Sequence, residues 1–267
     1  MIIDGKKIAE QILADVATRV KKLAIAGVGF RLAGVVAGDS DQSKFLNLKK
    51  AAAERVGIDF RKYEYPTNIS TQKLRKEISK IAKTSVNSGI IVQLPLPSHI
   101  NTQYILNAVP EEKDPDVLSQ KSQGTFFSDR GDILPPAVET VKIIFEENNI
   151  KPQRKICSVF GYGILVGKPV SHWLARRGAT VNIINEFTPN AGKISGAADI
   201  IISGVGKSNL ITGEMVKNGA VVIDFGKDVD FENVAAKSAL ITPPTGGVGP
   251  IVIASLLRNL IKLKTAI

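Results

Sequence analysis

The 267-residue chain contains one cysteine, Cys157, and two histidines, His99 and His172. A lone thiol cannot form an intrachain disulfide, and because Cys157 lies in an apolar strand-like run, we expect it to be buried and inert. Neither histidine has a second soft ligand nearby in sequence, so we expect no metal site. The same scarcity argues against a hydrolase built on a Ser-His-Asp or Cys-His arrangement.

Long apolar runs are also missing. No run approaches the roughly 20 residues of a membrane span, and the first residues lack the order of a secretory signal. We therefore expect a soluble cytoplasmic protein with no membrane partner. Aromatic residues make up only 6% of the chain, and no recognisable nucleic-acid-binding module is present.

The net charge is +10, but the basic residues alternate with apolar ones at helical spacing, as in residues 72–77, which is typical of solvated helix faces. We expect no nucleic-acid partner. A positive field that attracts a small polyanionic substrate or cofactor explains the charge equally well.

Helical and strand patterns alternate along the whole chain, which indicates βαβ units and mainly parallel sheets. The sequence therefore predicts the α/β class, with two domains that meet near residues 120–140. Helices are expected at residues 4–26, 45–56, 71–85, 135–148, 167–178 and 249–264, and strands at residues 32–38, 59–65, 89–93, 155–160, 179–185, 199–203, 220–224 and 239–242.

The strand at residues 89–93 ends in a single polar amide. Its apolar residues are typical of a strand buried on both faces, and the prolines after Gln93 cannot continue a ladder. Ligands bind at the carboxyl ends of strands in open α/β sheets, so Gln93 is a candidate site residue. An amide that only satisfies loop backbone is the alternative.

A glycine turn follows the strand at residues 155–160. Gly161, Gly163 and Gly167 precede a helix, which is the setting for a dinucleotide pyrophosphate at a helix N-terminus. The next strand ends at Glu186, a residue type that hydrogen-bonds the ribose of NAD and repels the extra phosphate of NADP. A merely exposed glutamate is the alternative.

Several segments together resemble one family. They are Gln-Leu-Pro-Leu-Pro at residues 93–97, Lys-Asp-Pro-Asp at 113–116, the glycine turn, Thr-Pro-Pro-Thr-Gly-Gly-Val-Gly-Pro at 242–250, Asp-Gly-Lys at 4–6, and residues 198–207 and 222–226. The chain resembles the methylenetetrahydrofolate dehydrogenase/cyclohydrolase (FolD) family over essentially its whole length.

The resemblance implies two α/β domains around a cleft. Residues 1–135, completed by the C-terminal helix at 250–267, would bind folate, and residues 136–249 would form a Rossmann-type NAD(P)-binding domain through which a homodimer forms. The implied reactions belong to one-carbon metabolism and purine biosynthesis. They are oxidation of 5,10-methylenetetrahydrofolate to the methenyl form with NAD(P), and hydrolysis of that form to 10-formyltetrahydrofolate.

The family's site residues fall on matching positions of this chain. The resemblance implies catalytic roles for Lys49, Gln93 and Asp116, and substrate contacts for these three. A carboxylate at position 116 can accept paired hydrogen bonds from the pterin. A lysine buried against a cationic carbon would have its ammonium form disfavoured, so that it could relay protons. Further substrate contacts are implied for Phe45, Gly247 and Pro250.

The cofactor contacts implied by the resemblance surround the glycine turn and two later loops. They are Gly161, Tyr162, Gly163, Val166, Gly167, Glu186, Gly204, Val205, Gly206 and Gly246.

The chain departs from the family at both sites. Phe45 stands where tyrosine is usual, Val117 replaces a glycine, and residues 136–138 replace a Cys-Thr-Pro-like segment. Tyr162 and Gly163 replace Arg-Ser, and residues 185–188 replace a His-Ser-basic-Thr segment. Family membership favours NADP, but these residues favour NAD. The alternatives are a Rossmann-type oxidoreductase for another small substrate and a non-catalytic folate- or nucleotide-binding protein.

Overall fold

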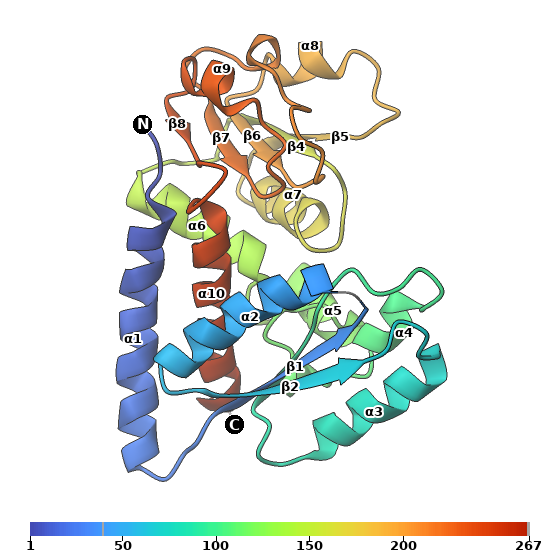
Figure 1. The fold of residues 1–267 in the computed structure, drawn as a ribbon. Helices are drawn as coiled ribbons and strands as arrows, with labels where there is room; N and C mark the ends of the chain where they lie inside the picture. Colours follow the sequence, from blue (N-terminus) through green and yellow to red (C-terminus); the bar gives the residue numbers. More distant parts are fainter. Residues whose placement is uncertain (39, 266–267) are drawn as a thin grey trace. The chain divides into compact units, whose positions relative to one another are not determined.

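The chain forms two compact units (Figure 1). This computed structural model describes residues 1–38 and 40–265, and for residues 40–43 the backbone only. The first unit comprises residues 10–136 and those from 253 onward, and the second comprises residues 1–9 and 137–252. Helices α1 (Gly5–Ile25) and α10 (Val248–Thr265) run across the boundaries between them.

The first nine residues group with the second unit, although the sequence analysis assigned residues 1–135 to one domain. The reason is pairing with the last strand of that unit. Ile2 forms a parallel bridge with Ile241, and the backbone N–H of Ile3 donates to the Ile241 carbonyl oxygen at 2.9 Å.

The first unit is built on a three-stranded parallel sheet in the order β2-β1-β3. The strands are β1 (Arg31–Ala37), β2 (Asp59–Tyr65) and β3 (Gly89–Val92). Its remaining helical elements are α2 (Ser40–Arg55), α3 (Thr71–Lys83), α4 (Thr102–Leu106), η1 (Glu111–Lys113) and α5 (Gln120–Phe127). Because β1 lies in the centre, right-handed crossovers place α2 and α3 on opposite faces of the sheet, as Figure 1 shows.

Local chemistry explains the ends of these elements. Helix α2 is followed by Gly57, whose φ of +83° suits glycine. The Ser70 hydroxyl caps α3 by accepting from the Lys73 N–H at 3.3 Å. Every residue of β3 is buried, as predicted for a strand covered on both faces.

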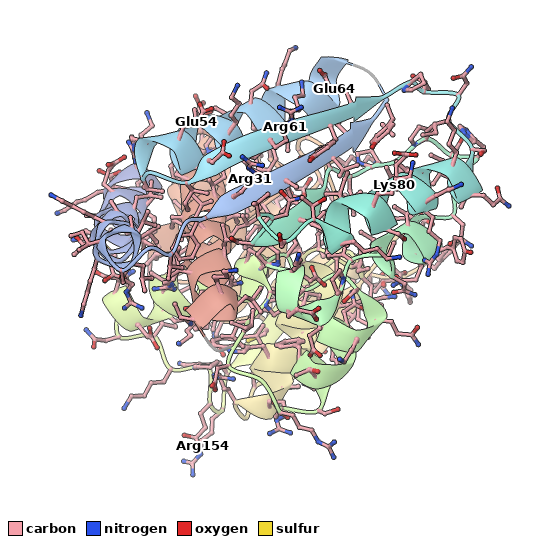
Figure 2. The ribbon with its side chains drawn as sticks, turned by 90° about the horizontal axis from the view of Figure 1, so that it is seen from below. Arg31, Glu54, Arg61, Glu64, Lys80 and Arg154 are labelled. Atoms are coloured by element: carbon pink, nitrogen blue, oxygen red, sulfur yellow. The ribbon has the colours of Figure 1, made fainter. Side chains whose placement is uncertain are left out.

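Strand β2 forms one edge of this sheet and carries charged residues of both signs. Arg31 pairs with Asp59 across the ladder, and Lys62 Nζ lies 2.7 Å from Glu64 Oε1. Figure 2 shows Arg31, Arg61 and Glu64 along these two strands. Charged side chains on an edge strand oppose pairing with another sheet.

The second unit is built on a five-stranded parallel sheet in the order β5-β4-β6-β7-β8. The strands are β4 (Ile156–Phe160), β5 (Thr180–Ile184), β6 (Ile200–Ser203), β7 (Val221–Asp224) and β8 (Leu240–Ile241). Its helical elements are α6 (Pro136–Glu147), α7 (Gly167–Arg176), α8 (Ala191–Ser195), η2 (Gly213–Met215) and α9 (Phe231–Ala235).

The core of the second unit lies against this sheet. Phe160, Ile184, Ile201 and Val222 belong to one buried cluster. Cys157 is fully buried, as expected, and burial raises the pKa of its thiol to about 12. Within the described residues, no helix has both the length and the apolar content to cross a membrane.

Each sheet has a point at which the strand order reverses. In the first unit the chain passes from β1 to β2 on one side and then to β3 on the other side of β1. In the second unit it passes from β4 to β5 and then to β6 on the other side of β4. Ligands of open α/β sheets bind at such points, beyond the carboxyl ends of the strands. The fold therefore provides two candidate sites.

Candidate active site

Lys49 and Asp116 meet in the first unit. Helix α2, which follows β1, carries Lys49, and its Nζ lies 3.8 Å from Asp116 Oδ2. The exposed fractions of the two side chains are 7% and 13%. The Phe45 ring, one helical turn before Lys49, has its centroid 5.4 Å from Nζ. A largely buried amine thus lies between a carboxylate and an aromatic ring.

The turn that carries Asp116 is fixed by backbone hydrogen bonds and by Val117. The Val117 N–H donates to the Asp114 carbonyl oxygen at 3.2 Å. Val117 itself has a φ of +58° and is 3% exposed. A β-branched residue is rare in this left-handed region, so the conformation is the one that glycine, the family's usual residue here, adopts without strain.

Asp114 and Asn259 hold this turn from two sides. The Asp114 carboxylate accepts from the backbone N–H groups of Leu118 at 3.0 Å and Ser119 at 2.8 Å. Burial nonetheless raises the pKa of Asp114, against the lowering effect of the Ser119 N–H. From α10, the Asn259 amide donates to the Pro115 carbonyl oxygen at 3.0 Å. Both residues therefore position Asp116 without being site residues themselves.

Gln93 follows β3 directly, and its backbone N–H donates to the Val35 oxygen on β1 at 2.8 Å. The side-chain Nε2 donates to the Leu94 carbonyl oxygen at 2.8 Å, as the loop-satisfying alternative expected. Its buried Oε1 has no hydrogen-bond partner among the described residues. A buried acceptor without a donor is costly, so this oxygen is available to a ligand.

The glycine turn of the second unit disfavours side chains at two positions, by its backbone conformation at Gly161 and by lack of room at Gly167. Gly161 has a φ of +84°, and a Cβ on Gly167 would lie 2.1 Å from the Gly161 oxygen. A Cβ on Gly163, by contrast, would meet no described atom within 4 Å. The turn is closely packed at Gly167 and open at Gly163. An open backbone of this kind can approach a pyrophosphate closely.

A cation lies beside this turn. Lys168, in the first turn of α7, has its Nζ 5.7 Å from the centroid of the Tyr162 ring. An ammonium group at a helix N-terminus can pair with a phosphate. Lys168 is not among the predicted site residues, although its place directly after Gly167 was a usable signal.

Glu186 lies in the turn after β5, and it is exposed. The Gly161 N–H donates to the Ile184 carbonyl oxygen at 2.8 Å, which joins the ends of β4 and β5. Glu186 and the glycine turn thus occupy neighbouring strand ends, as the ribose and pyrophosphate of one dinucleotide require.

The loop after β6 is organised by Asp228, a fully buried residue that the sequence analysis missed. Its carboxylate accepts from the N–H groups of Val205 at 2.8 Å, Gly206 at 2.7 Å and Lys207 at 2.6 Å. The Ser203 hydroxyl donates to it at 2.5 Å. Asp228 therefore fixes a predicted cofactor loop. The only sequence signal for this role was the place of Asp228 two residues after the Asp-Phe-Gly segment at residues 224–226.

Two distant motifs of the chain meet in the second unit. A Cβ on Gly5 would lie 1.7 Å from the Gly247 oxygen, and a Cβ on Gly246, whose φ is +77°, would lie 3.1 Å from Lys6 Cε. The Asp-Gly-Lys segment therefore packs directly on the loop that precedes α10, in the first turn of which Pro250 lies.

The predicted residues divide between the two units. Phe45, Lys49, Gln93 and Asp116 belong to the first unit, whereas Gly246, Gly247 and Pro250 belong to the second. Contact of one folate with both groups stays a prediction. Within the described part of the chain, no three His, Cys, Asp or Glu side chains gather in a way that could hold a metal ion.

Two parallel sheets with polar groups at their reversals of strand order define an α/β enzyme with a dinucleotide-binding unit. Residues 3–116 match the model of the tetrahydrofolate dehydrogenase/cyclohydrolase catalytic domain, and residues 135–266 match that of the family's NAD(P)-binding domain. The chain belongs to the tetrahydrofolate dehydrogenase/cyclohydrolase family. It is an enzyme of that family and uses a nicotinamide dinucleotide.

Relatives match over nearly the full length. The bifunctional protein FolD of Nautilia profundicola is 39% identical, over 98% of this chain and 96% of the relative. That of Moorella thermoacetica is 38% identical, over 98% and 97%. The bifunctional FolD structure from Campylobacter jejuni has a TM-score of 0.94 at 32% identity and covers 100% of this chain and 99% of its own. The Trypanosoma brucei enzyme, solved with NADP and an inhibitor, has a TM-score of 0.95 at 29% identity, over 100% and 97%.

Proposed function

We propose that the chain oxidises 5,10-methylenetetrahydrofolate to 5,10-methenyltetrahydrofolate with NAD as the preferred hydride acceptor, and that it hydrolyses the methenyl product to 10-formyltetrahydrofolate. The observation that carries the proposal is the buried pair of Lys49 and Asp116 at 3.8 Å. The second reaction consumes one water and releases one proton, so it needs a group that can move a proton.

The three polar residues of the first unit have separate roles in this proposal. Asp116 accepts hydrogen bonds from the amino-pyrimidine edge of the pterin, as a carboxylate does with a forked donor. Lys49 transfers a proton to or from the water that attacks the methenyl carbon. Gln93 supports this step with its unpaired Oε1, which can accept from the water or from Lys49.

Binding of the pterin also changes the partner of Lys49. In the free protein the Asp116 carboxylate faces the lysine. Once that carboxylate accepts hydrogen bonds from the pterin, the Lys49 amine can turn to the water that attacks the methenyl carbon. Lys49 is then ready to act on water only when substrate is present.

The second unit supplies the dehydrogenase step. A nicotinamide held there would supply the hydride acceptor, and the main task of the protein is to place the methylene carbon of the folate against it. The open backbone at Gly163, the Lys168 ammonium and the loop ordered by Asp228 support a dinucleotide at this sheet end.

The preference for NAD rests on what surrounds the ribose. Glu186 is exposed at the end of β5 and would repel a 2′-phosphate. Tyr162 and Phe187 stand at two positions where the family usually has a basic residue. The charge that would bind NADP is therefore missing.

An absorbance assay tests both reactions. Purified protein given methylenetetrahydrofolate should reduce NAD at least about tenfold more efficiently than NADP, a difference of about 1.4 kcal/mol. Reduction of neither cofactor would refute the dehydrogenase proposal and favour another substrate. Folate binding without turnover would favour a purely binding role.

Substitutions of two adjacent lysines, Lys49 and Lys50, test the hydrolysis step. Lys49→Met should abolish conversion of methenyl- to formyltetrahydrofolate, whereas Lys50→Met should not, because Lys50 pairs with Glu54 on the helix surface at 3.7 Å. If the parent protein never accelerates this step, the cyclohydrolase assignment is wrong.

The same proposal covers domain roles and assembly. The first unit would hold folate and the second the dinucleotide, in a cytoplasmic homodimer. The edge strand β5 supports assembly through the second unit, because Ile183 is 40% exposed there and Ile156 on β4 is 37% exposed. Strand pairing at this edge would engage the backbone groups of β5 that face away from β4, and a copy packed there would cover Ile183. Light scattering of wild type and Ile183→Lys tests this: a wild-type monomer would refute it.

A further inference from the structure

Phe187 is the most exposed of the large apolar residues that the structure describes, with 84% of its surface accessible. It lies three residues beyond the end of β5 at Ile184 and directly after Glu186. Single exposed apolar residues are common, so exposure alone does not assign a role to this ring.

The turn that presents Phe187 is ordered rather than loose. The Asn185 side-chain oxygen accepts from the Phe187 N–H at 3.0 Å, and the Asn185 N–H donates to the Thr188 hydroxyl at 2.9 Å. The Thr188 N–H donates to the Asn185 carbonyl oxygen at 3.1 Å. The ring is thus held outward by a preorganised backbone, which lowers the entropic cost of binding.

Other exposed apolar residues follow the neighbouring strands. Tyr162 and Leu165 lie after β4 and are 51% and 48% exposed, and Val205 lies after β6 and is 46% exposed. Together with Phe187 they form what we call the apolar rim. Three adjacent strands of the sheet each end in a member of this rim, on the side where dinucleotides bind.

We infer that Phe187 is the stacking platform for the adenine ring of the cofactor, next to Glu186 at the ribose. This inference rests on the proposed use of NAD. The ribose hydroxyl that Glu186 would bind is on the carbon next to the one that carries the base. The adenine therefore lies beside the residue that follows Glu186, and in this chain that residue is an aromatic ring.

The inference explains how the chain keeps its affinity for a dinucleotide without the usual basic residue. A basic residue at this position would gain most from the 2′-phosphate, which NAD lacks, whereas an aromatic ring gains energy from the adenine that NAD also carries. Because stacking uses the face of the base and not its edge, replacing adenine by hypoxanthine should change the affinity little.

ADP-ribose is the probe, since it contains the adenosine half without nicotinamide. We expect Phe187→Ala to weaken ADP-ribose binding, measured by calorimetry, by about five- to one-hundred-fold, the range found for loss of a base–aromatic stack. Phe187→Tyr should restore the wild-type affinity. Ile25→Ala is the matched control, because Ile25 is 83% exposed at the end of α1. In turnover, Phe187→Ala should raise the KM for NAD and leave kcat within about twofold, as loss of uniform binding does.

The outcomes separate this inference from the proposed function. If Phe187→Ala binds ADP-ribose as tightly as the wild type while the wild type reduces NAD, the stacking role is wrong and the proposed function stands. If the substitution changes only the oligomeric state, Phe187 belongs to a contact between copies and the inference falls. If the wild type binds no ADP-ribose, the inference fails with the cofactor proposal.

Discussion

The amine of Lys49 lies 3.8 Å from the carboxylate of Asp116, and neither side chain has more than 13% of its surface exposed. The two residues come from separate elements of the first unit, helix α2 and the turn after η1. A charge pair that is this buried is costly to form and is poor evidence of a stabilising role. Its burial beside the Phe45 ring, at positions that match the site residues of the family, instead indicates a site kept for chemistry.

Substitution of Asp116 tests the folate contact. We expect Asp116→Asn to raise the KM for methylenetetrahydrofolate about tenfold or more, because a hydrogen bond to a charged group contributes about 1.5–3 kcal/mol. Initial-rate kinetics measure the effect. The control is Glu112→Gln, at an exposed position of η1. Equal KM values for wild type and Asp116→Asn would contradict the assignment.

A Phe45→Tyr substitution tests the effect of the hydroxyl that this chain lacks at the position of the family's usual tyrosine. The ring is 37% exposed, so Phe45→Tyr should change the free energy of unfolding by less than about 0.5 kcal/mol. A regained hydrogen bond to Lys49 or to folate should raise the cyclohydrolase rate about two- to tenfold. Dehydrogenase activity should change less than twofold. Phe45→Leu lacks the hydroxyl and should give no gain, so a gain with leucine would point to packing instead.

Val117 tests the left-handed backbone of the Asp116 turn. Val117→Ala and Val117→Gly both remove a buried side chain, but a left-handed residue with a Cβ costs about 1–2 kcal/mol. We therefore expect the glycine variant to be about 1 kcal/mol more stable than the alanine variant in urea unfolding. At Val16, buried in helix α1, alanine should be the more stable of the two, since glycine costs about 1 kcal/mol in a helix. If the alanine variant were the more stable of the two at both positions, backbone strain at Val117 would be ruled out.

Asp228 links stability to cofactor affinity. Asp228→Asn replaces an acceptor by an amide that cannot accept from all three N–H groups of residues 205–207, so we expect a loss of at least about 2 kcal/mol. The KM for NAD should rise while the KM for folate is maintained. Asp230→Asn is the control, because the Asp230 carboxylate accepts from the exposed Asn233 side chain at 2.6 Å and not from the loop at residues 205–207. An unchanged cofactor KM in a folded Asp228→Asn variant would leave Asp228 a purely structural residue.

Asp199 predicts a pH dependence. The hydrogen bonds from Lys217 Nζ at 2.7 Å and from the Ile156 N–H at 3.0 Å lower the pKa of its carboxyl. A carboxyl with a lowered folded-state pKa contributes stability above the unfolded-state pKa, and this contribution is lost as pH falls through the folded-state pKa. Asp199→Asn should therefore destabilise the protein at pH 7 and have almost no effect at about pH 2. Urea unfolding over this range measures the difference. Asp132→Asn, at an exposed loop position, should show no such trend.

The strands and long helices could be predicted because their patterns reflect burial. Strand β3 ends at Val92, one residue before the predicted end at Gln93, and the change from β-branched residues to an amide and prolines indicated this end. Helix α2 begins at Ser40, earlier than the predicted residue 45, because its first turn is polar and shows no apolar period. The short elements α4, η1 and α5 are absent from the prediction, since each has too few residues to display a period.

The sequence could predict which residues belong to the sites but not the distances between them. Lys49 and Asp116 could be selected from the motifs of the family, yet no pattern states that their charges lie 3.8 Å apart. The supporting residues Asp228 and Asn259 act through backbone hydrogen bonds to residues far away in the chain, whereas Asp114 accepts from residues four and five positions on. Such bonds depend on the finished fold, so a local reading of the sequence cannot find them.

The contact of Gly5 with Gly247 has a consequence for synthesis of the protein. The opening segment leaves the ribosome long before the loop on which it packs, and a Cβ at Gly5 would overlap that loop. The second unit therefore cannot close until translation has passed residue 247. Until then, Ile2 and Ile3 lack their strand partner Ile241.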